Sequence, residues 1–106
     1  MRNAVVLSLR EPGEIDPRTV LSGPLTSLRR VRLSPGERVV VSADGSEFTL
    51  FVLSGSGVGR SGDAEVTLRQ GVSVTAPLKT VLKLEAGSEG LEYFYAELAV
   101  REDGAG

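Results

Sequence analysis

The side chains best suited to chemistry gather around Asp44. Ser42 and Glu47 lie close to it in the chain, and all three carry oxygen atoms that can accept or donate protons. If Asp44 faced an apolar interior, desolvation would raise the pKa of its carboxyl and let it act as a general acid or base. In the alternative interpretation, Asp44-Gly45 only forms a hairpin turn, for which this dipeptide is typical, and Ser42 is a small polar residue rather than a nucleophile.

The chain has no histidine and no cysteine. This composition excludes Ser-His-Asp and Cys-His catalysis, disulfides, thiol redox chemistry and the usual zinc sites. Serine chemistry assisted by lysine would need Lys79 or Lys83 in the interior, but both fall on the polar side of the local alternation. We therefore expect no cofactor, no metal and no covalent hydrolysis.

Two further patterns have simpler explanations. Residues 57–62, Gly-Val-Gly-Arg-Ser-Gly, match the dinucleotide-binding pattern, but that site needs a helix to follow, and Asp63–Leu68 has the pattern of a strand. The cluster of Arg29, Arg30 and Arg32 could meet an anionic substrate or form a solvated face. The 12 basic and 14 acidic residues give a net charge of -2, which argues against nucleic acid as a partner.

Short runs rich in Val, Leu, Thr and aromatic residues, separated by Gly and Pro, predict an all-β chain. The eight expected strands are Val5–Leu9, Leu28–Leu33, Arg38–Ser42, Phe48–Leu53, Glu65–Leu68, Val72–Ala76, Thr80–Leu84 and Leu91–Val100. Ser54–Gly62 and Gly87–Gly90 are expected to be turns, and Asp16 to cap at most one helical turn over Asp16–Leu21. Such short antiparallel strands fit a jelly roll or small β-barrel, which hides the sheet edges.

The chain length of 106 residues suffices for one hydrophobic core. We expect a single domain over residues 1–100 and a flexible C-terminal tail over residues 101–106. The sequence contains no apolar run long enough to span a membrane, and Met1–Arg10 lacks the apolar region of a secretory signal. These features predict a cytoplasmic protein that does not associate with membranes.

The glycines and the proline between Gly36 and Pro77 have the spacing of the two signature motifs of the cupins, a family of small β-barrels of jelly-roll type. The first motif places His-x-His and a glutamate between two glycines. Here Gly36 and Gly55 keep that spacing, with Ser42-x-Asp44 at the histidine positions and Phe48 at the glutamate position.

The second cupin motif, in which a glycine is followed by Pro, Gly and His, resembles the segment from Gly71 to Leu82. Pro77 is kept, whereas Lys79 replaces the glycine and Leu82 the histidine. The resemblance covers roughly half of the chain and implies the cupin fold.

All four metal ligands of the family are replaced, and Asp44 alone cannot substitute for three imidazoles and a carboxylate. The resemblance therefore implies a metal-free member, and cupins commonly pair through sheet contacts, which implies a homodimer.

The ligand positions of the family point into the barrel, so alternation from them predicts the whole inner face. The predicted inward residues are Val40, Ser42, Asp44, Phe48, Leu50, Val52, Val66, Leu68, Val72, Val74, Ala76, Thr80, Leu82 and Leu84. On the last strand, Phe94, Ala96 and Leu98 are expected inside, with Tyr93 and Tyr95 on the outer surface or at a subunit contact.

A lumen this apolar is either packed shut or open to an apolar or aromatic small molecule. In the open form, the ligand-binding residues would be Ser42, Phe48, Leu50, Thr80 and Leu82.

The first candidate function is thus a metal-independent binding or accessory protein for a small, largely apolar metabolite. The second is a cofactor-free isomerase, cyclase or epimerase in which Asp44, with Glu47 or a tyrosine, moves protons. The third is a structural or regulatory interaction module, which a filled lumen would favour.

Overall fold

The computed structural model describes residues 9–19, 24–42 and 45–100. Most of these residues lie in strands, which confirms the predicted all-β chain. The elements are β1 (Gly13–Ile15), the 3-10 turn η1 (Pro17–Thr19), β2 (Leu25–Leu33), β3 (Arg38–Ser42), β4 (Ser46–Ser61), β5 (Ala64–Arg69), β6 (Ser73–Ala76) and β7 (Val81–Ala99). No helix in this described part of the chain is long and apolar enough to cross a membrane. The predicted tail, residues 101–106, lies outside it.

The local sequence signals for strands and turns are met in most places. Asp16 Oδ1 accepts a hydrogen bond of 3.0 Å from the backbone N–H of Arg18, so the predicted helical turn is present as η1. The expected runs correspond to β2 through β7, with two of them joined in β7. Residues 5–8 of the expected run Val5–Leu9 are not among those described. β1 was not expected, because its three residues are too short to show alternation.

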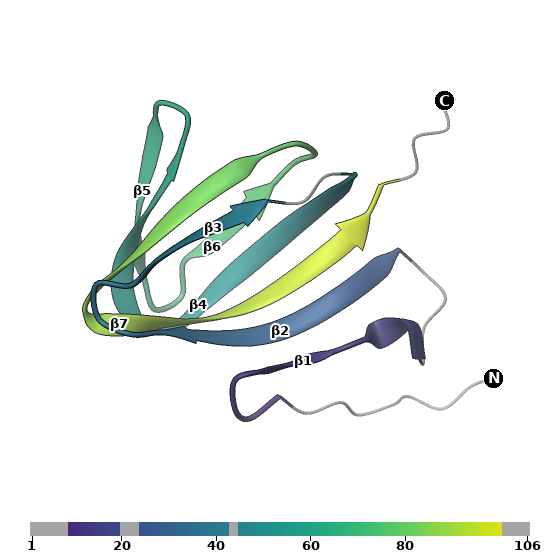
Figure 1. Ribbon diagram of the computed structural model, residues 1–106, viewed down its shortest axis with the longest axis horizontal. Coiled ribbons are helices and arrows are strands. Elements are labelled where there is room, and N and C mark those ends of the chain that lie inside the picture. Colours follow the sequence, from purple (N-terminus) through teal and green to yellow (C-terminus); the bar gives the residue numbers. More distant parts are fainter. Residues whose placement is uncertain (1–8, 20–23, 43–44, 101–106) are drawn as a thin grey trace.

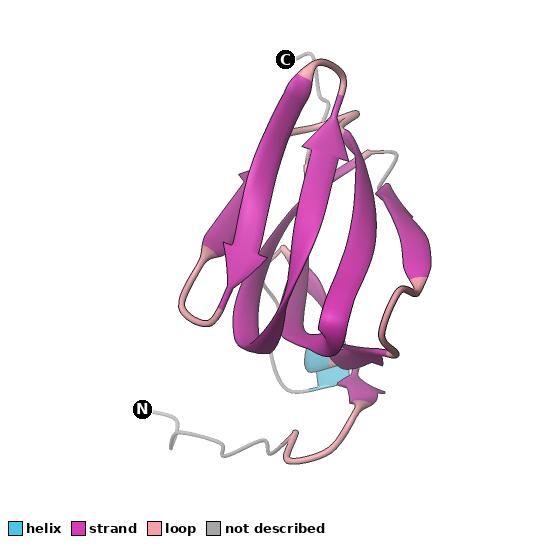
Figure 2. Ribbon diagram, turned by 90° about the vertical axis from the view of Figure 1, so that its left-hand side faces the viewer, coloured by secondary structure: helices cyan, strands magenta, loops and turns pink. Residues whose placement is uncertain are grey.

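The strands form one antiparallel sheet of seven strands in the order β1-β2-β7-β4-β5, with β3 also paired to β7 and β6 to β4. β4 and β7 pair with each other along most of their length. β3 pairs with the first part of β7, and β2 pairs with its second part. Both long strands bend near their middle, so the sheet curls and its two halves face each other (Figures 1 and 2).

Glycines make this bend possible. The predicted turns at Ser54–Gly62 and Gly87–Gly90 were wrong, because most of these residues lie within β4 and β7. The pairing of β4 with β7 shifts register twice near Gly55. Gly55 and Gly90 have φ angles of 84° and 77°, and a Cβ on Gly55 would meet the carbonyl oxygen of Gly90. Bulges and glycines sharpen the local twist where two backbones approach closely. These glycines therefore mark a corner within two long strands.

The core lies between the two halves of the sheet, and on most strands it has the residues that alternation predicted. The predicted inward residues that are buried are Phe48, Leu50, Val52, Leu68, Ala76, Leu82 and Leu84. Three more, Val66, Val72 and Val74, are partly buried and pack against them.

The predicted inner face of β3 is wrong by one residue. Val39 pairs with Leu84 and Val41 with Leu82, and both valines pack against the core. Val40 is 63% exposed and Ser42 is also exposed, on the opposite face. Three consecutive valines carry no polarity signal, so only the pairing with β7 sets which face is inside.

The predicted orientation of the last strand is also reversed. Tyr93 and Tyr95 are buried in the core, with exposed fractions of 3% and 2%. They pair with Val52 and Leu50, which are themselves buried, so both tyrosines share the inner face. Phe94 lies on the outer face and is only partly buried. Both sets of residues on this strand are largely apolar, and the sequence therefore did not distinguish them.

Candidate ligand-binding site

The positions that correspond to the cupin metal ligands do not fit a metal in this chain. Phe48 and Leu82 are 1% and 3% exposed and offer no ligand atom, and Ser42 lies on the outer face of β3. Asp44 is not among the described residues. Across the ranges that the structure describes, no group of three or more acidic side chains could hold a metal ion.

Side chains fill the interior between the sheet halves. Leu50, Val52 and Leu68 are each 0% exposed, and Phe48 and Leu84 are 1% exposed. Values this low mean that no space large enough for water adjoins these side chains, as in a close-packed core. Three of the predicted ligand-binding residues, Phe48, Leu50 and Leu82, are thus core residues. Thr80 is half-buried just before β7, where its N–H donates to the carbonyl of Pro77.

A polar cluster occupies one end of the inner face. We call it the Arg29 cluster, and its members are Glu14, Ser27, Arg29, Ser46, Tyr95 and Glu97. The Arg29 guanidinium lies 4.5 Å from the centroid of the Tyr95 ring and 3.6 Å from Glu97. Glu97 also accepts hydrogen bonds from Tyr95 (2.7 Å) and Ser46 (3.2 Å). This network satisfies the polar groups that β2, β4 and β7 bring to the inner face.

The surroundings of the tyrosines change their ionisation. Burial, together with the hydrogen bond to Glu97, raises the pKa of the Tyr95 phenol well above its usual range. Burial also raises the pKa of Tyr93. Both phenols are therefore neutral at physiological pH, and Tyr95 acts as a hydrogen-bond donor.

The three arginines that are adjacent in sequence do not form one site. Arg29 belongs to the inner face, whereas Arg30 and Arg32 lie on the outer face of β2, opposite Phe94 and Glu92 of β7. Arg30 Nε donates to the carboxylate of Glu92 at 2.9 Å, and Arg32 contacts the same group at 3.4 Å. The hydrogen bond from Arg30 lowers the pKa of Glu92 despite its burial. Because successive side chains of a strand point to opposite faces, the predicted basic cluster is split between the inner and the outer face of the sheet.

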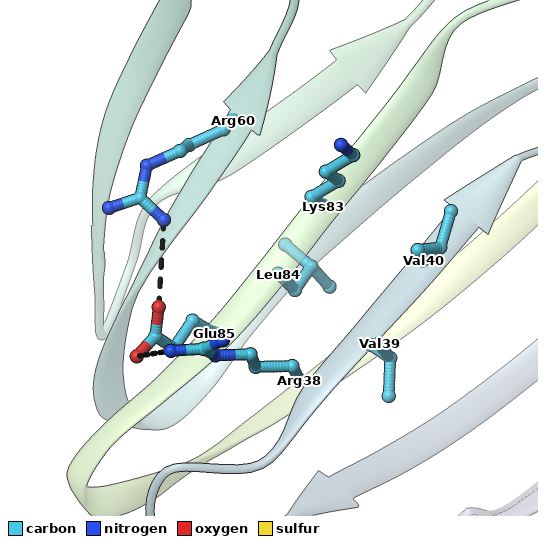
Figure 3. A pocket seen from close by; sticks show the side chains of 7 residues that line it. All are labelled: Arg38, Val39, Val40, Arg60, Lys83, Leu84 and Glu85. Atoms are coloured by element: carbon cyan, nitrogen blue, oxygen red, sulfur yellow. Dashed lines mark ion pairs between the residues drawn. The ribbon is translucent and has the colours of Figure 1, made fainter.

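A depression lies on the outer face where β3, β7 and β4 run side by side (Figure 3). It has a volume of about 500 Å³, within the range of small-molecule sites. We call it the cationic depression, and its lining residues are Arg38, Val39, Val40, Arg60, Lys83, Leu84 and Glu85. Val40 and Arg60 both pair with Lys83, from its two sides, so these three side chains stand in one row across the sheet.

Ion pairs occupy one end of the cationic depression. Arg38 reaches Glu85 at 3.6 Å from β3, and Arg60 reaches it at 3.5 Å from β4. Figure 3 shows both guanidinium groups turned toward this carboxylate, with Lys83 and Val40 beyond it. Arg60 is further held by Glu65 at 3.1 Å. Both arginines are thus oriented by carboxylates, although their side chains remain exposed to solvent.

The other end of the cationic depression carries apolar surface. Val40 is 63% exposed, and Val81, which lies on the same face just outside the lining, is 48% exposed. These two are among the few large apolar side chains in the described ranges that are this exposed. Lys83 pairs with Val40 and lies two residues from Val81 on β7, so its aliphatic stem extends this surface.

The sequence assigned Lys83 correctly to the outer face, but it did not predict a site there. Val40 was expected inside, so its place beside Lys83 was missed. Arg38, Arg60 and Lys83 lie on three different strands and are far from one another in the sequence. Only the register of β3 and β4 on β7 brings them together, and no local pattern contains that information.

Solved structures of cupins are similar to this chain over most of its length. A cupin protein from Bacteroides fragilis matches with a TM-score of 0.77 and 19% identity, over 96% of this chain and 89% of that one. A Cupin 2 conserved barrel domain protein from Salinispora arenicola matches with a TM-score of 0.76 and 11% identity, over 93% and 92%. A predicted oxalate decarboxylase from Thermotoga maritima matches with a TM-score of 0.67 and 19% identity, over 73% and 69%.

No family model matches the chain, and no curated protein matches it in sequence. Similarity at such low identity concerns the fold, not the activity. The glycine and proline spacing predicted the same architecture from the sequence. The chain therefore has the cupin fold.

Proposed function

We propose that this chain is a metal-independent binding or accessory protein that holds a small, largely apolar molecule in the cationic depression. The observation that carries the proposal is a recess of about 500 Å³ flanked by the exposed Val40. Exposed apolar surface inside a concave region is typical of ligand sites. The packed interior supports an outer site, because Leu50 and Phe48 leave no room at the centre of the sheet.

Hexanol is a suitable neutral probe, because it is small and carries a purely aliphatic body. Binding is measured by NMR on protein with labelled valine methyl groups. We expect the signals of Val40 and Val81 to shift with increasing hexanol, and those of the core residue Val52 to stay in place. Because apolar contact drives this binding, the exchange Val40→Thr should weaken it. Phe51→Thr is the matched control, since Phe51 is also exposed but lies on the other half of the sheet.

The filled interior also favours the third candidate, a structural or regulatory interaction module. The same experiment separates the two functions. Shifts confined to Val40 and Val81 support small-molecule binding. If hexanol leaves both signals unchanged at its solubility limit, or if Phe51→Thr weakens binding as much as Val40→Thr, the small-molecule proposal fails. An interaction module would then be the function that the packed core supports.

Catalysis by Asp44 and a homodimer both remain predictions from the sequence. Catalysis by Asp44 concerns a residue outside the described ranges. Tyr93 and Tyr95 were predicted to lie on the outer surface or at a subunit contact, but both side chains are buried in the core. A dimer would therefore need a different outer surface.

A further inference from the structure

The cationic depression contains more positive than negative charge. Its lining includes three basic side chains, Arg38, Arg60 and Lys83, and one acidic side chain, Glu85. The chain as a whole has the opposite balance, with a net charge of -2. A local concentration of cations in a concave region raises the local concentration of anions.

Two of the three basic side chains in the cationic depression form ion pairs, whereas the third, Lys83, does not form one with any described residue. Glu85 is shared by Arg38 and Arg60, and Arg60 has Glu65 as a second partner. Lys83 has no hydrogen bond or ion pair with any residue in the described ranges. Its ammonium group is exposed and lies in the row between Val40 and Arg60. A cation next to an apolar surface can bind a molecule with an anionic head and an apolar body.

We infer that the molecule bound in the cationic depression is an amphiphilic anion, such as an alkyl carboxylate or an alkyl phosphate, whose charged group is bound by Lys83. The inference rests on the proposed function, since it concerns the same site. The apolar body lies on Val40 and Val81, and the anionic group lies between Lys83 and Arg60. No covalent step is involved, so binding is reversible and weakens with salt.

The test compares three probes that share one aliphatic chain: hexanol, hexanoate and hexyl phosphate. Lysine-selective isotope labelling is informative here, because the chain contains only Lys79 and Lys83. We expect the side-chain signals of Lys83 to shift with hexanoate and hexyl phosphate, and those of Lys79 to stay in place. Affinity should increase from hexanol through hexanoate to hexyl phosphate, since the phosphate carries the most negative charge.

Charge variants measure the contribution of each residue. Lys83→Gln should weaken hexyl phosphate binding about threefold, as expected for an exposed ion pair, and should weaken hexanol binding less. Lys79→Gln makes the same change of charge outside the depression and is the matched control. Glu85→Gln should strengthen hexyl phosphate binding, because it removes the one carboxylate of the lining.

The outcomes separate this inference from the proposed function. If hexanol and hexyl phosphate bind at Val40 with equal affinity at low salt, the site exists and the anion inference is wrong. If Lys79→Gln weakens binding as much as Lys83→Gln, the effect is one of total charge and the inference is also wrong. If no probe shifts Val40, Val81 or Lys83, both the inference and the proposed function are overturned.

Discussion

The hydroxyl group of Tyr95 donates a hydrogen bond of 2.7 Å to the carboxylate of Glu97, two residues further along the inner face of β7. This contact explains how tyrosine can occupy a position in the core, where an unpaired hydroxyl would cost about 1–3 kcal/mol. The ring of Tyr95 packs against Phe48, with their centroids 5.5 Å apart. One residue thus joins the apolar core to the Arg29 cluster.

The tyrosines predict a specific alkaline titration. Burial raises the pKa of both Tyr93 and Tyr95, and these are the only two tyrosines of the chain. At a pH of about 10, where a free phenol is half ionised, we expect less tyrosinate absorbance from the folded protein than from the unfolded protein. In concentrated guanidinium chloride, the same protein should titrate with the ordinary midpoint.

The linked effect on stability follows from the direction of these shifts. A raised folded-state pKa contributes stability that is present below the unfolded pKa of about 10 and is lost as pH rises toward the folded value. The free energy of unfolding should therefore fall above about pH 10, and tyrosinate should appear together with the loss of β-sheet circular dichroism. Ionisation of either tyrosine in a fully folded protein would contradict its burial.

Much of the fold was predictable from the sequence because its signals are local or depend on spacing. Alternation from the ligand positions of the family identified the inner faces of β4, β5, β6 and the first part of β7. It failed on β3 and on the second part of β7, where both faces are apolar. In those segments the pairing partner decides the orientation, and pairing is not encoded locally.

The candidate site was much less predictable than the fold. The family resemblance directed attention to the barrel centre, which Phe48 and Leu82 fill. The cationic depression depends on the register that aligns Val40, Lys83 and Arg60 across three strands. Each of these residues is ordinary in its own strand, and only their position beside one another suggests binding.

Metal removal and metal addition should leave stability unchanged. Of the predicted ligand positions in the described ranges, Phe48 and Leu82 are core residues without donor atoms, and Ser42 lies on the outer face of β3. A ligand that binds only the folded state raises its stability in proportion to the logarithm of ligand concentration over Kd. We therefore expect equal melting temperatures in EDTA and in excess Mn²⁺, Fe²⁺ or Ni²⁺, measured by calorimetry. A melting temperature that rises with metal concentration would contradict metal independence.

Glu92 should stabilise the fold through its ion pairs on the outer face of β7. Its side chain is 8% exposed and receives a hydrogen bond of 2.9 Å from Arg30. Glu92→Gln should lower the free energy of unfolding by about 1–3 kcal/mol at neutral pH. Because the pKa of Glu92 is lowered in the fold, this contribution is present above the unfolded pKa of about 4.3 and disappears as pH falls through the folded value.

The matched control for Glu92 is Glu65→Gln. Glu65 pairs with Arg60 at 3.1 Å, but its side chain is 60% exposed, and exposed pairs typically contribute under about 1 kcal/mol. Chemical denaturation of both variants across a range of acidic and neutral pH gives the comparison. Equal losses for the two exchanges, or a loss for Glu92→Gln that persists at strongly acidic pH, would show that the Arg30 pair is not the cause.

The corner of the sheet should tolerate no side chain at Gly55. This residue combines a φ of 84° with close approach of the Gly90 carbonyl, so Gly55→Ala introduces backbone strain and a steric clash together. Gly36→Ala is the matched control, because Gly36 has a φ of 76° but open space around its Cβ position. The control should lose about 1–2 kcal/mol of stability from strain alone, measured by chemical denaturation. Gly55→Ala should lose more stability than the control, because β4 and β7 must separate or shift register at the corner. Equal losses of stability for both variants would mean that the close approach of the Gly90 carbonyl does not define the corner.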